Sequence, residues 1–397
     1  MFNTIEEAIE DIKNGKMVVV IDDPDRENEG DLLMAAEMAT PEAINFMAKH
    51  GRGLICMPVA KKYMDQLSIG PMVSNNTDNH ETAFTVSIDH IDTTTGISAH
   101  ERSLTIQKVL ESEEPTDFRR PGHIFPLIAK DQGVLVRKGH TEAAVDLPRL
   151  AGLKPAGVIC EIMSEDGTMA RTPELIEYAN KHQLKIITIA DLIEYRKQTE
   201  IDNLVERVVE TDMPTKYGDF RMYGFINKIT GEHHVALVKG DVTTDPQLLR
   251  VHSECLTGDA LGSKRCDCGE QYDEAMNRIS KEESGLVLYM RQEGRGIGLI
   301  NKLKAYSHQD NGLDTVEANI ELGFDADLRE YDVAAAMLRN LGVKDIRLMT
   351  NNPRKVDGLN KYGLNVVERV KIQMNHNERN EFYLKTKQNK LNHYLNY

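Results

Sequence analysis

The chain has 397 residues, 40% of them hydrophobic, which is enough for two or three domains with separate cores. Its formal net charge of −15 argues against a general nucleic-acid binder, and no run approaches the roughly 20 apolar residues of a membrane span. Five cysteines are too few for a disulfide framework and the acidic start MFNTIEEAIED is not a signal peptide, so we expect a soluble, reducing, cytoplasmic protein.

Helix and strand signals alternate along the first half of the chain. Thr4 and Glu7 fit a capping box, which predicts a helix through about Asn14. The β-branched run at 17–21 predicts a buried strand, and the polar stretch DDPDRENEGD at 22–31 follows it. Similar signals predict strands at 32–36, 157–160 and 184–190, and helices that begin at Thr40 and Thr172, each followed by proline.

A highly charged segment at 191–220 marks a break between two halves. We place the domain boundary near residue 200, which gives domains 1–199 and 200–397. Strands and helices alternate again in the second half, so each half is expected to be α/β (mixed α+β), with sheet and helix layers. The elements expected there are strands at 285–290 and 345–350, helices at 314–324 and 332–343, a further helix after 351–355, and a loosely ordered Asn- and Lys-rich stretch over the last 26 residues.

Three cysteines, Cys255, Cys266 and Cys268, lie within fourteen positions. A zinc site with three protein ligands and an open fourth position is typical of catalysis, whereas structural sites are closed by four ligands. A structural zinc with His252 or His233 as a remote fourth ligand, or three thiols without metal, are the alternatives. The adjacent RVHSE favours catalysis, because a zinc-bound water is activated near neutral pH.

A glycine-rich loop, RQEGRGIG at 291–298, separates the predicted strand at 285–290 from a helix. It is not a dinucleotide fingerprint, because its glycine spacing is G-x-G-x-G and an arginine lies inside it. A loop between a strand and a helix is well placed to bind phosphate, and Arg295 adds a bidentate donor.

These stretches together resemble GTP cyclohydrolase II over about 205–370, on RVHSECLTGD, GSKRCDCGEQ, YMRQEGRGIGL, DTVEAN, DADLREY and TNNPRK. The resemblance implies hydrolysis of GTP at the imidazole carbon C8 with release of formate and pyrophosphate. It implies one Zn²⁺ on the three cysteines, Asp327 as proton acceptor and Arg329 as nucleophile; an ordinary surface ion pair is the alternative for the last two. The GTP-binding residues that it implies are Arg250, Val251, His252, Ser253, Glu254, Gln271, Glu293, Gly294, Arg295, Thr315, Thr350 and Lys355.

The first half carries a different pattern. DRENEGD at 25–31 packs four carboxylates and one arginine between two apolar runs. Such a run is often a solvated loop, and a divalent-metal site is the alternative, since Mg²⁺ prefers a few carboxylates and retains waters. Downstream, two histidines each follow a glycine, in RRPGHIFPL at 119–127 and RKGHTEAAVD at 137–146, and Glu161 follows a predicted strand.

With TTGISAHERSLTI at 94–106 and CEIMSEDGTMAR at 160–171, these stretches resemble 3,4-dihydroxy-2-butanone 4-phosphate synthase over residues 1 to about 199. The resemblance implies conversion of ribulose 5-phosphate to a four-carbon ketose phosphate and formate. It implies Mg²⁺ or Mn²⁺, two ions in all, on Glu27 and His140, and catalytic roles for His123 and Glu161. The substrate-binding residues that it implies are Arg26, Glu27, Asp31, Arg137, Lys138, Gly139, His140, Thr141 and Glu161.

The sequence therefore predicts a fused bifunctional enzyme of riboflavin synthesis, with both domains dimerising and the synthase site completed across the dimer interface. Pro24 and Glu101 depart from the synthase pattern, but neither is an assigned site residue. The first alternative is that only the cyclohydrolase is active and the N-terminal half is a dimerisation scaffold. The second is a zinc-stabilised regulator that binds GTP without hydrolysing it.

Overall fold

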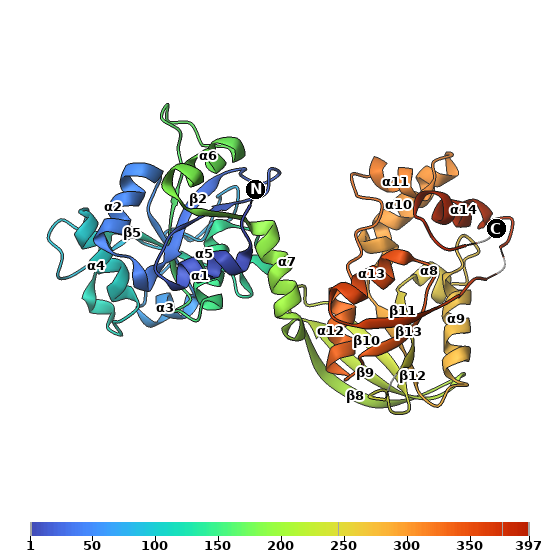
Figure 1. The fold of residues 1–397 in the computed structure, drawn as a ribbon. Helices are drawn as coiled ribbons and strands as arrows, with labels where there is room; N and C mark the ends of the chain where they lie inside the picture. The colour runs from blue at the N-terminus through green and yellow to red at the C-terminus, as the bar shows by residue number, and fades with distance from the viewer. Residues whose placement is uncertain (1, 245, 375, 396–397) are drawn as a thin grey trace. The chain divides into compact units, whose positions relative to one another are not determined.

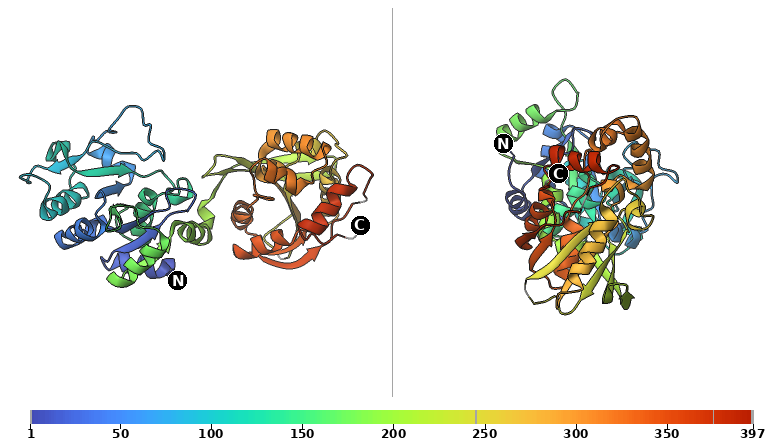
Figure 2. Two further views of the ribbon diagram at one scale, coloured as in Figure 1. Left: turned by 90° about the horizontal axis from the view of Figure 1, so that it is seen from above. Right: turned by 90° about the vertical axis from the view of Figure 1, so that its right-hand side faces the viewer.

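The computed structural model describes residues 2–244, 246–374 and 376–395. They form two compact units, Met1–Arg196 and Lys197–Tyr397, each built on one seven-stranded sheet with helices on its faces (Figures 1 and 2). Of the described helices, none is both long and apolar enough to cross a membrane.

The sheet of the first unit has the order β4-β5-β3-β6-β2-β1-β7 and mixes parallel with antiparallel pairs. β1 lies antiparallel to β2 and parallel to β7, and β2 lies antiparallel to β6. Asp31 on β2 is directly opposite Glu161 on β6, so two predicted site residues share one face. The strands are β1 (Val18–Ile21), β2 (Gly30–Ala35), β3 (Cys56–Val59), β4 (Ile88–His90), β5 (Phe118–Ile128), β6 (Gly157–Glu161) and β7 (Lys185–Thr188).

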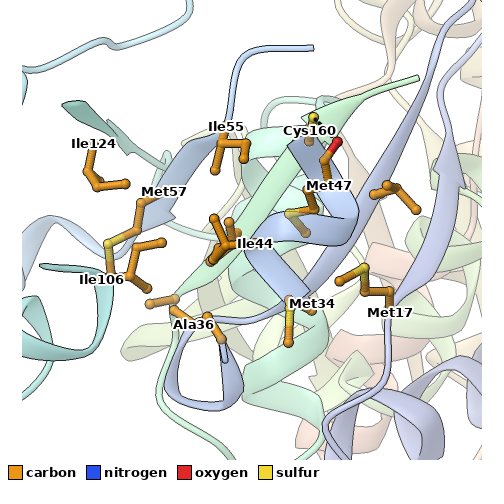
Figure 3. Close-up of a cluster of buried hydrophobic side chains, with 14 of the residues drawn as sticks. Met17, Met34, Ala36, Ile44, Met47, Ile55, Met57, Ile106, Ile124 and Cys160 are labelled. Atoms are coloured by element: carbon orange, nitrogen blue, oxygen red, sulfur yellow. Dashed lines mark hydrogen bonds between the residues drawn. The ribbon is translucent and has the colours of Figure 1, made fainter. Parts of the chain in front are cut away.

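Both faces of this sheet are covered by helices. Alternate residues of a strand point to opposite faces, so Val19 and Met34 join one core cluster and Val18 and Leu33 join another. Figure 3 shows part of the first cluster, where Ile44 and Met47 pack near Met34. The helices are α1 (Ile5–Lys13), α2 (Pro41–Phe46), α3 (Lys61–Gln66), α4 (Ala99–Val109), α5 (His140–Leu150), α6 (Thr172–His182) and α7 (Ile189–Thr199), with helical turns at Ala36–Met38, Met47–Gly51, Pro115–Asp117 and Gly133–Leu135.

The sheet of the second unit has the order β14-β13-β11-β12-β10-β9-β8. β11 is parallel to both β12 and β13, whereas β8, β9 and β10 form an antiparallel meander. The carboxyl ends of β11, β12 and β13 therefore meet at one edge of the sheet. The strands are β8 (Val205–Thr215), β9 (Gly218–Asn227), β10 (His233–Lys239), β11 (Gln247–Ser253), β12 (Gly285–Met290), β13 (Asp345–Met349) and β14 (Asn365–Val370).

One face of this second sheet packs against a helix whose Ala275, Met276 and Ile279 join Leu248 and Val287 in a core cluster. That helix is α9, and Figure 1 shows α12 and α13 on the other side of the sheet. The helices are α8 (Leu256–Asp259), α9 (Cys268–Ile279), α10 (Gly298–Asp310), α11 (Thr315–Glu321), α12 (Asp332–Asn340), α13 (Pro353–Lys361) and α14 (Glu381–Lys390), with 3-10 turns η5 (Ile201–Asn203) and η6 (Glu293–Gly296).

The two-part mixed α/β architecture is confirmed, and three local expectations need correction. The helix expected from Thr172 has Arg171 as its N-cap, so Thr172 is already inside α6. The strand expected at 184–190 ends at Thr188, because Ile189 begins α7. The last 26 residues are not loosely ordered where they are described, since α14 lies there and Leu384 is fully buried.

Candidate functional sites

The polar loop after β1 brings a metal-ligand set together in the first unit. Oxygen or nitrogen atoms of Asp22, Glu27 and His140 all lie within 4.8 Å of one another. His140 Nε2 lies 3.1 Å from the carbonyl oxygen of Val20, which accepts a hydrogen bond when Nε2 carries the proton. Its Nδ1 faces Glu27 at 3.7 Å and Asp31 at 4.0 Å; it can donate to Glu27 when the ring is protonated, and in the neutral ring it would offer its lone pair to a cation. One imidazole and two carboxylates suit a divalent cation such as Mg²⁺ or Mn²⁺.

Buried charges hold this loop in place. Asp22 accepts hydrogen bonds from the backbone N–H groups of Glu27 and Glu29, and it forms a 2.8 Å ion pair with Arg26. Burial would raise the pKa of Glu27, but its hydrogen bond with His140 and the charge of Arg26 hold that pKa at about 2. Burial raises the pKa of Asp31 to about 7. The loop is therefore tied down by hydrogen bonds and an ion pair, with Asp22 and Asp31 buried at its two ends.

The predicted substrate-binding residues at 137–141 lie where the chain enters α5. Gly139 is the N-cap of α5, so His140 and Thr141 lie in its first turn, where backbone N–H groups are free to bind an anion. Arg137 pairs with Glu142 at 2.6 Å and donates to the carbonyl of His80 at 3.0 Å, whereas Lys138 is exposed.

Glu161 ends β6, and its Oε2 accepts a hydrogen bond from Leu54 N–H at 2.8 Å. His123 lies on β5, where its Nδ1 is 2.7 Å from Asp89 and its side chain is 43% exposed. Among the described residues, the hydrogen bonds of His123 do not connect it with Glu27 or His140.

The three cysteines of the second unit come together at the start of α9. All three Sγ atoms lie within 4.8 Å of one another, and Cys255 Sγ is 3.6 Å from Cys266 Sγ. A tetrahedral zinc with Zn–S bonds of about 2.3 Å separates its sulfurs by about 3.8 Å, so the cluster has the dimensions of a zinc site. A Cβ on Gly258 would lie 2.9 Å from Cys266 Sγ and 3.1 Å from Cys255 Sγ, which explains the glycine.

Within the described residues, no histidine or carboxylate joins the three thiols. His252 lies 2.9 Å from Asp259 and stacks on Tyr289, and His233 is exposed. Hydrogen bonds from Cys266 and Cys268, with the charge of Lys302, lower the pKa of Cys255, and the resulting thiolate raises the pKa values of Cys266 and Cys268. If all three cysteines were thiolates, their mutual repulsion would have to be offset by a cation, and all three residues line the cavity described next.

The cavity is built at the carboxyl ends of β11, β12 and β13. Gly294 and Arg295 have left-handed backbone conformations, with φ values of 62° and 63°, in the turn that follows β12. Buried polar atoms of four cavity residues, Arg250 Nε, His252 Nδ1, Ser253 Oγ and Gln292 Oε1, have no partner among the described residues, as expected where a polar ligand binds. The predicted residues that line it are Arg250, His252, Ser253, Glu254, Gln271, Glu293, Gly294, Arg295, Thr315, Arg329, Thr350, Lys355 and the three cysteines.

Two predicted residues lie just behind the cavity wall. The carbonyl of Val251 accepts a 2.7 Å hydrogen bond from Lys355 Nζ. Asp327 forms a bidentate pair with Arg329, at 2.8 Å to Nε and 2.6 Å to Nη2. Burial opposes ionisation of Asp327, but its hydrogen bonds and the charge of Arg329 lower its pKa to about 2. The Asp327 side chain is buried and that of Arg329 is 12% exposed, so the pair is more shielded from solvent than an ordinary surface ion pair.

Each half of the chain matches a known protein family. The sequence profile of 3,4-dihydroxy-2-butanone 4-phosphate synthase matches residues 6–195, and that of GTP cyclohydrolase II matches residues 206–371. The riboflavin biosynthesis protein RibBA of Bacillus subtilis is 60% identical over 400 residues, and that of Bacillus cereus (strain B4264) is 60% identical over 398, each with both chains fully covered. The chain belongs to the RibBA family of riboflavin biosynthesis proteins.

It is therefore a bifunctional enzyme with a synthase unit, the first, and a cyclohydrolase unit, the second. A crystal structure of RibBX from A. baumannii, described as a two-domain 3,4-dihydroxy-2-butanone 4-phosphate synthase, matches with a TM-score of 0.67 and 38% identity, covering 94% of this chain and all of that one. A synthase structure in complex with two magnesium ions is 45% identical and covers 50% of this chain and 99% of that one, with a TM-score of 0.48.

Sequence reasoning missed two residues that touch the proposed ligand sets. Asp22 enters the sequence analysis only as part of a charged stretch. Its position directly after β1 is the signal that could have identified it as a candidate metal ligand. Lys302 lies on α10, and its Nζ is 3.1 Å from Cys255 Sγ, 3.0 Å from Thr257 Oγ1 and 2.7 Å from Glu293 Oε1. No local pattern marks that lysine, because the helix turn that carries it is far from the cysteines in sequence.

Lys302→Met in the RibBA-family chain is expected to lower zinc affinity and GTP turnover by about 10- to 100-fold, the usual effect of removing a partner of a metal ligand. The lysine stabilises the Cys255 thiolate and holds Glu293, and methionine can do neither. Zinc content after dialysis against a chelator and formate release from GTP measure the two effects. Lys304→Met, an exposed lysine of the same helix, is the matched control and should behave as the parent; equal behaviour of both variants contradicts the assignment.

Gly53→Ala is expected to reduce the synthase activity by about 100-fold through a displacement of Glu161 of the order of 1 Å. A Cβ at residue 53 would lie 2.4 Å from Glu161 Oε2 and 2.7 Å from its backbone oxygen. Turnover of ribulose 5-phosphate measures the loss, and turnover of GTP should not change. A Cβ at Gly70 meets nothing within 4 Å, so Gly70→Ala is the control. Full synthase activity in Gly53→Ala would show that the position of Glu161 is not critical.

Proposed function

We propose that residues 1–199 form the domain that converts ribulose 5-phosphate to 3,4-dihydroxy-2-butanone 4-phosphate and formate, and that residues 200–397 form the domain that hydrolyses GTP. The products of the second reaction are 2,5-diamino-6-(5-phosphoribosylamino)pyrimidin-4-one, formate and pyrophosphate. The observation that carries the proposal is the opening of the three-thiol cluster into the polar cavity that Arg329 also lines.

In the cyclohydrolase unit, Cys255, Cys266 and Cys268 hold one Zn²⁺, which when bound supplies an activated water for attack at the imidazole carbon C8. Gln271 faces the guanine edge. The cationic side chains of Arg250, Arg295 and Lys355 offset the charge of the triphosphate. The remaining positions that contact the nucleotide are Val251, His252, Ser253, Glu254, Glu293, Gly294, Thr315 and Thr350.

Pyrophosphate leaves in a separate step, carried by the Asp327–Arg329 pair. A guanidinium nitrogen of Arg329 forms a bond to the α-phosphorus as the bond from that phosphorus to the bridging oxygen breaks. Asp327 receives the proton that the guanidinium loses. Burial lowers the pKa of Arg329, but the charge of Tyr331 and the hydrogen bond and charge of Asp327 raise it. Because a guanidinium is ordinarily protonated, proton transfer to Asp327 accompanies the attack in this proposal. Water then cleaves the phosphorus–nitrogen bond.

In the synthase unit, Glu27 and His140 hold two Mg²⁺ or Mn²⁺ ions, which when bound stabilise negative charge on adjacent sugar oxygens. Arg26, Arg137, Lys138, Gly139 and Thr141 bind the phosphorylated sugar, the last two at the N-terminus of α5. Asp31 and Glu161, directly opposite each other on β2 and β6, hold or deprotonate the substrate. Ribulose 5-phosphate contains the atoms of the four-carbon product plus formic acid, so the overall reaction consumes no water.

The protein is proposed to act as a homodimer. His123 is half-exposed and oriented by Asp89, but no described hydrogen bond joins it to the Glu27 site of its own chain. A catalytic His123 that reaches the site of a second copy accounts for this separation. Sedimentation velocity gives the oligomeric state directly, and mixing inactive His123→Ala with inactive Glu27→Gln chains should restore some synthase activity if sites are shared.

Both proposed reactions release formate, so one assay tests them separately. The purified protein with Mg²⁺ is given GTP alone and then ribulose 5-phosphate alone. Formate from both substrates is expected. Formate from GTP only would make the first unit a scaffold, and formate from neither, with GTP bound tightly, would favour the nucleotide-sensing alternative.

A further inference from the structure

The segment that follows β14 contributes to the nucleotide cavity although it lies beyond residues 206–371, the range matched by the cyclohydrolase profile. α14 is held beside α11, where Lys390 pairs with Glu317 at 2.8 Å and with Asp314 (Figure 1). Further along, the backbone N–H of Tyr394 donates to the carbonyl of Asn351 at 2.8 Å. The cavity-lining residues of this segment are Tyr383, Lys387, His393 and Leu395.

Lys387 begins a chain of buried polar contacts that ends at the proposed guanine-facing residue. Its Nζ lies 2.7 Å from Asp267 Oδ1, and the two side chains are 11% and 1% exposed. Asp267 Oδ2 accepts a hydrogen bond from Gln271 Nε2 at 2.5 Å. Gln271 Oε1 in turn accepts one from Arg250 Nη2, also at 2.5 Å.

The chemistry of the two neighbours fixes which way the amide of Gln271 points. A carboxylate only accepts hydrogen bonds and a guanidinium only donates them, so Nε2 must face Asp267 and Oε1 must face Arg250. A side-chain amide without such neighbours can turn over with little change of shape, which exchanges its donor and its acceptor. Without Lys387, Asp267 would be a buried charge that has lost its direct ion-pair partner, and its hold on the amide would weaken.

The orientation of this amide decides which purine it can pair with. Each end of the amide has one capacity left, one N–H and one oxygen lone pair, so it can meet two adjacent groups of a base. A 6-oxo purine offers a carbonyl acceptor and an N1–H donor, whereas a 6-amino purine offers an amino donor and an N1 acceptor at the same places. One amide orientation therefore pairs with the first and the reversed orientation with the second.

We propose that Lys387 is a positioning residue for nucleotide specificity: through Asp267 it locks the amide of Gln271 in the orientation that pairs with guanine and rejects adenine. This inference rests on the proposed function, in which Gln271 faces the base of GTP. It assigns the C-terminal segment a role in substrate selection that the residues within 206–371 do not supply alone.

The test compares Lys387→Met with Lys385→Met, a matched control from the same helix whose side chain is 52% exposed and paired with Glu381. The KM for GTP and the inhibition constants of ATP and ITP are measured in the formate assay on the full-length zinc-loaded protein. A bidentate base contact discriminates by roughly 5- to 150-fold, so Lys387→Met should lose at least about five-fold of the preference for GTP over ATP. ITP has the same 6-oxo edge and should follow GTP, kcat should change less than KM, and Lys387→Arg should restore the preference.

An unchanged ratio of the ATP inhibition constant to the GTP KM in Lys387→Met would overturn the inference. Equilibrium binding of GTP and ATP by calorimetry reports the same preference without turnover. Failure of the proposed function, seen as no formate from GTP in the parent, is thereby separated from failure of this inference.

Discussion

Cys268→Ser is expected to abolish formate release from GTP, by about 1,000-fold or more, because a neutral hydroxyl does not replace a thiolate as a zinc ligand and the water loses its activation. Cys268 is the first residue of α9, so the helix start positions its sulfur beside those of Cys255 and Cys266. Formate from GTP and zinc content per chain are the two measurements, and both should fall together.

The same Cys268→Ser chain should release formate from ribulose 5-phosphate at the parental rate, because that site lies in the other unit. Cys56→Ala, which removes a buried thiol of the synthase unit, should leave zinc content and GTP turnover unchanged. A Cys268→Ser protein that keeps its zinc and hydrolyses GTP would show that the three-thiol cluster is not the catalytic metal site.

Glu27→Gln is expected to have the opposite selectivity: formate release from ribulose 5-phosphate falls by about 1,000-fold or more, while release from GTP is unchanged. The amide keeps the shape of the side chain but removes the negative charge that faces His140 Nδ1 at 3.7 Å and pairs with Arg26 at 2.9 Å. The site then holds a divalent cation much more weakly, which titration with Mn²⁺ measures.

Asp25→Asn is the control for Glu27→Gln, because it removes an exposed carboxylate from the same loop with the same change of charge. It should leave metal binding and both activities intact. If Glu27→Gln still turned over ribulose 5-phosphate, the residues would be present without their proposed role, and the first unit would act as a scaffold.

Local sequence signals predicted local structure well, because their causes are local. Thr4 Oγ1 accepts a hydrogen bond from Glu7 N–H at 3.2 Å, as a capping box requires, and Asp314 caps α11 in the same way. The one-residue error at α6 arose because proline is also accepted at the second helical position, so Thr172-Pro173 did not fix where the helix begins.

The order of the strands and the closure of the sites could not be predicted, because both depend on contacts between distant segments. Nothing near β11 indicates that it pairs with β13, almost a hundred residues later. The C-terminal stretch looked unstructured from its composition, yet Lys387 pairs with Asp267, 120 positions earlier. The sequence motifs contain many of the residues that line the cavity of the second unit. They did not indicate that the C-terminal segment also lines it, which only the fold shows.

Several of the groups proposed to act on GTP lie just beyond strand ends, such as Cys255 after β11, Arg295 after β12 and Thr350 after β13, while the strands carry buried aliphatic side chains such as Leu249 and Leu288. Turns tolerate substitution far better than a packed sheet does. A chain with this architecture could therefore lose one of its two activities through substitutions at a few loop positions, while its fold and stability stay the same. Similarity of fold would not reveal such a loss. Whether a protein with this architecture, including one described only as a synthase, has cyclohydrolase activity is therefore better predicted from its thiols, its counterpart of Arg329 and its glycine-rich turn.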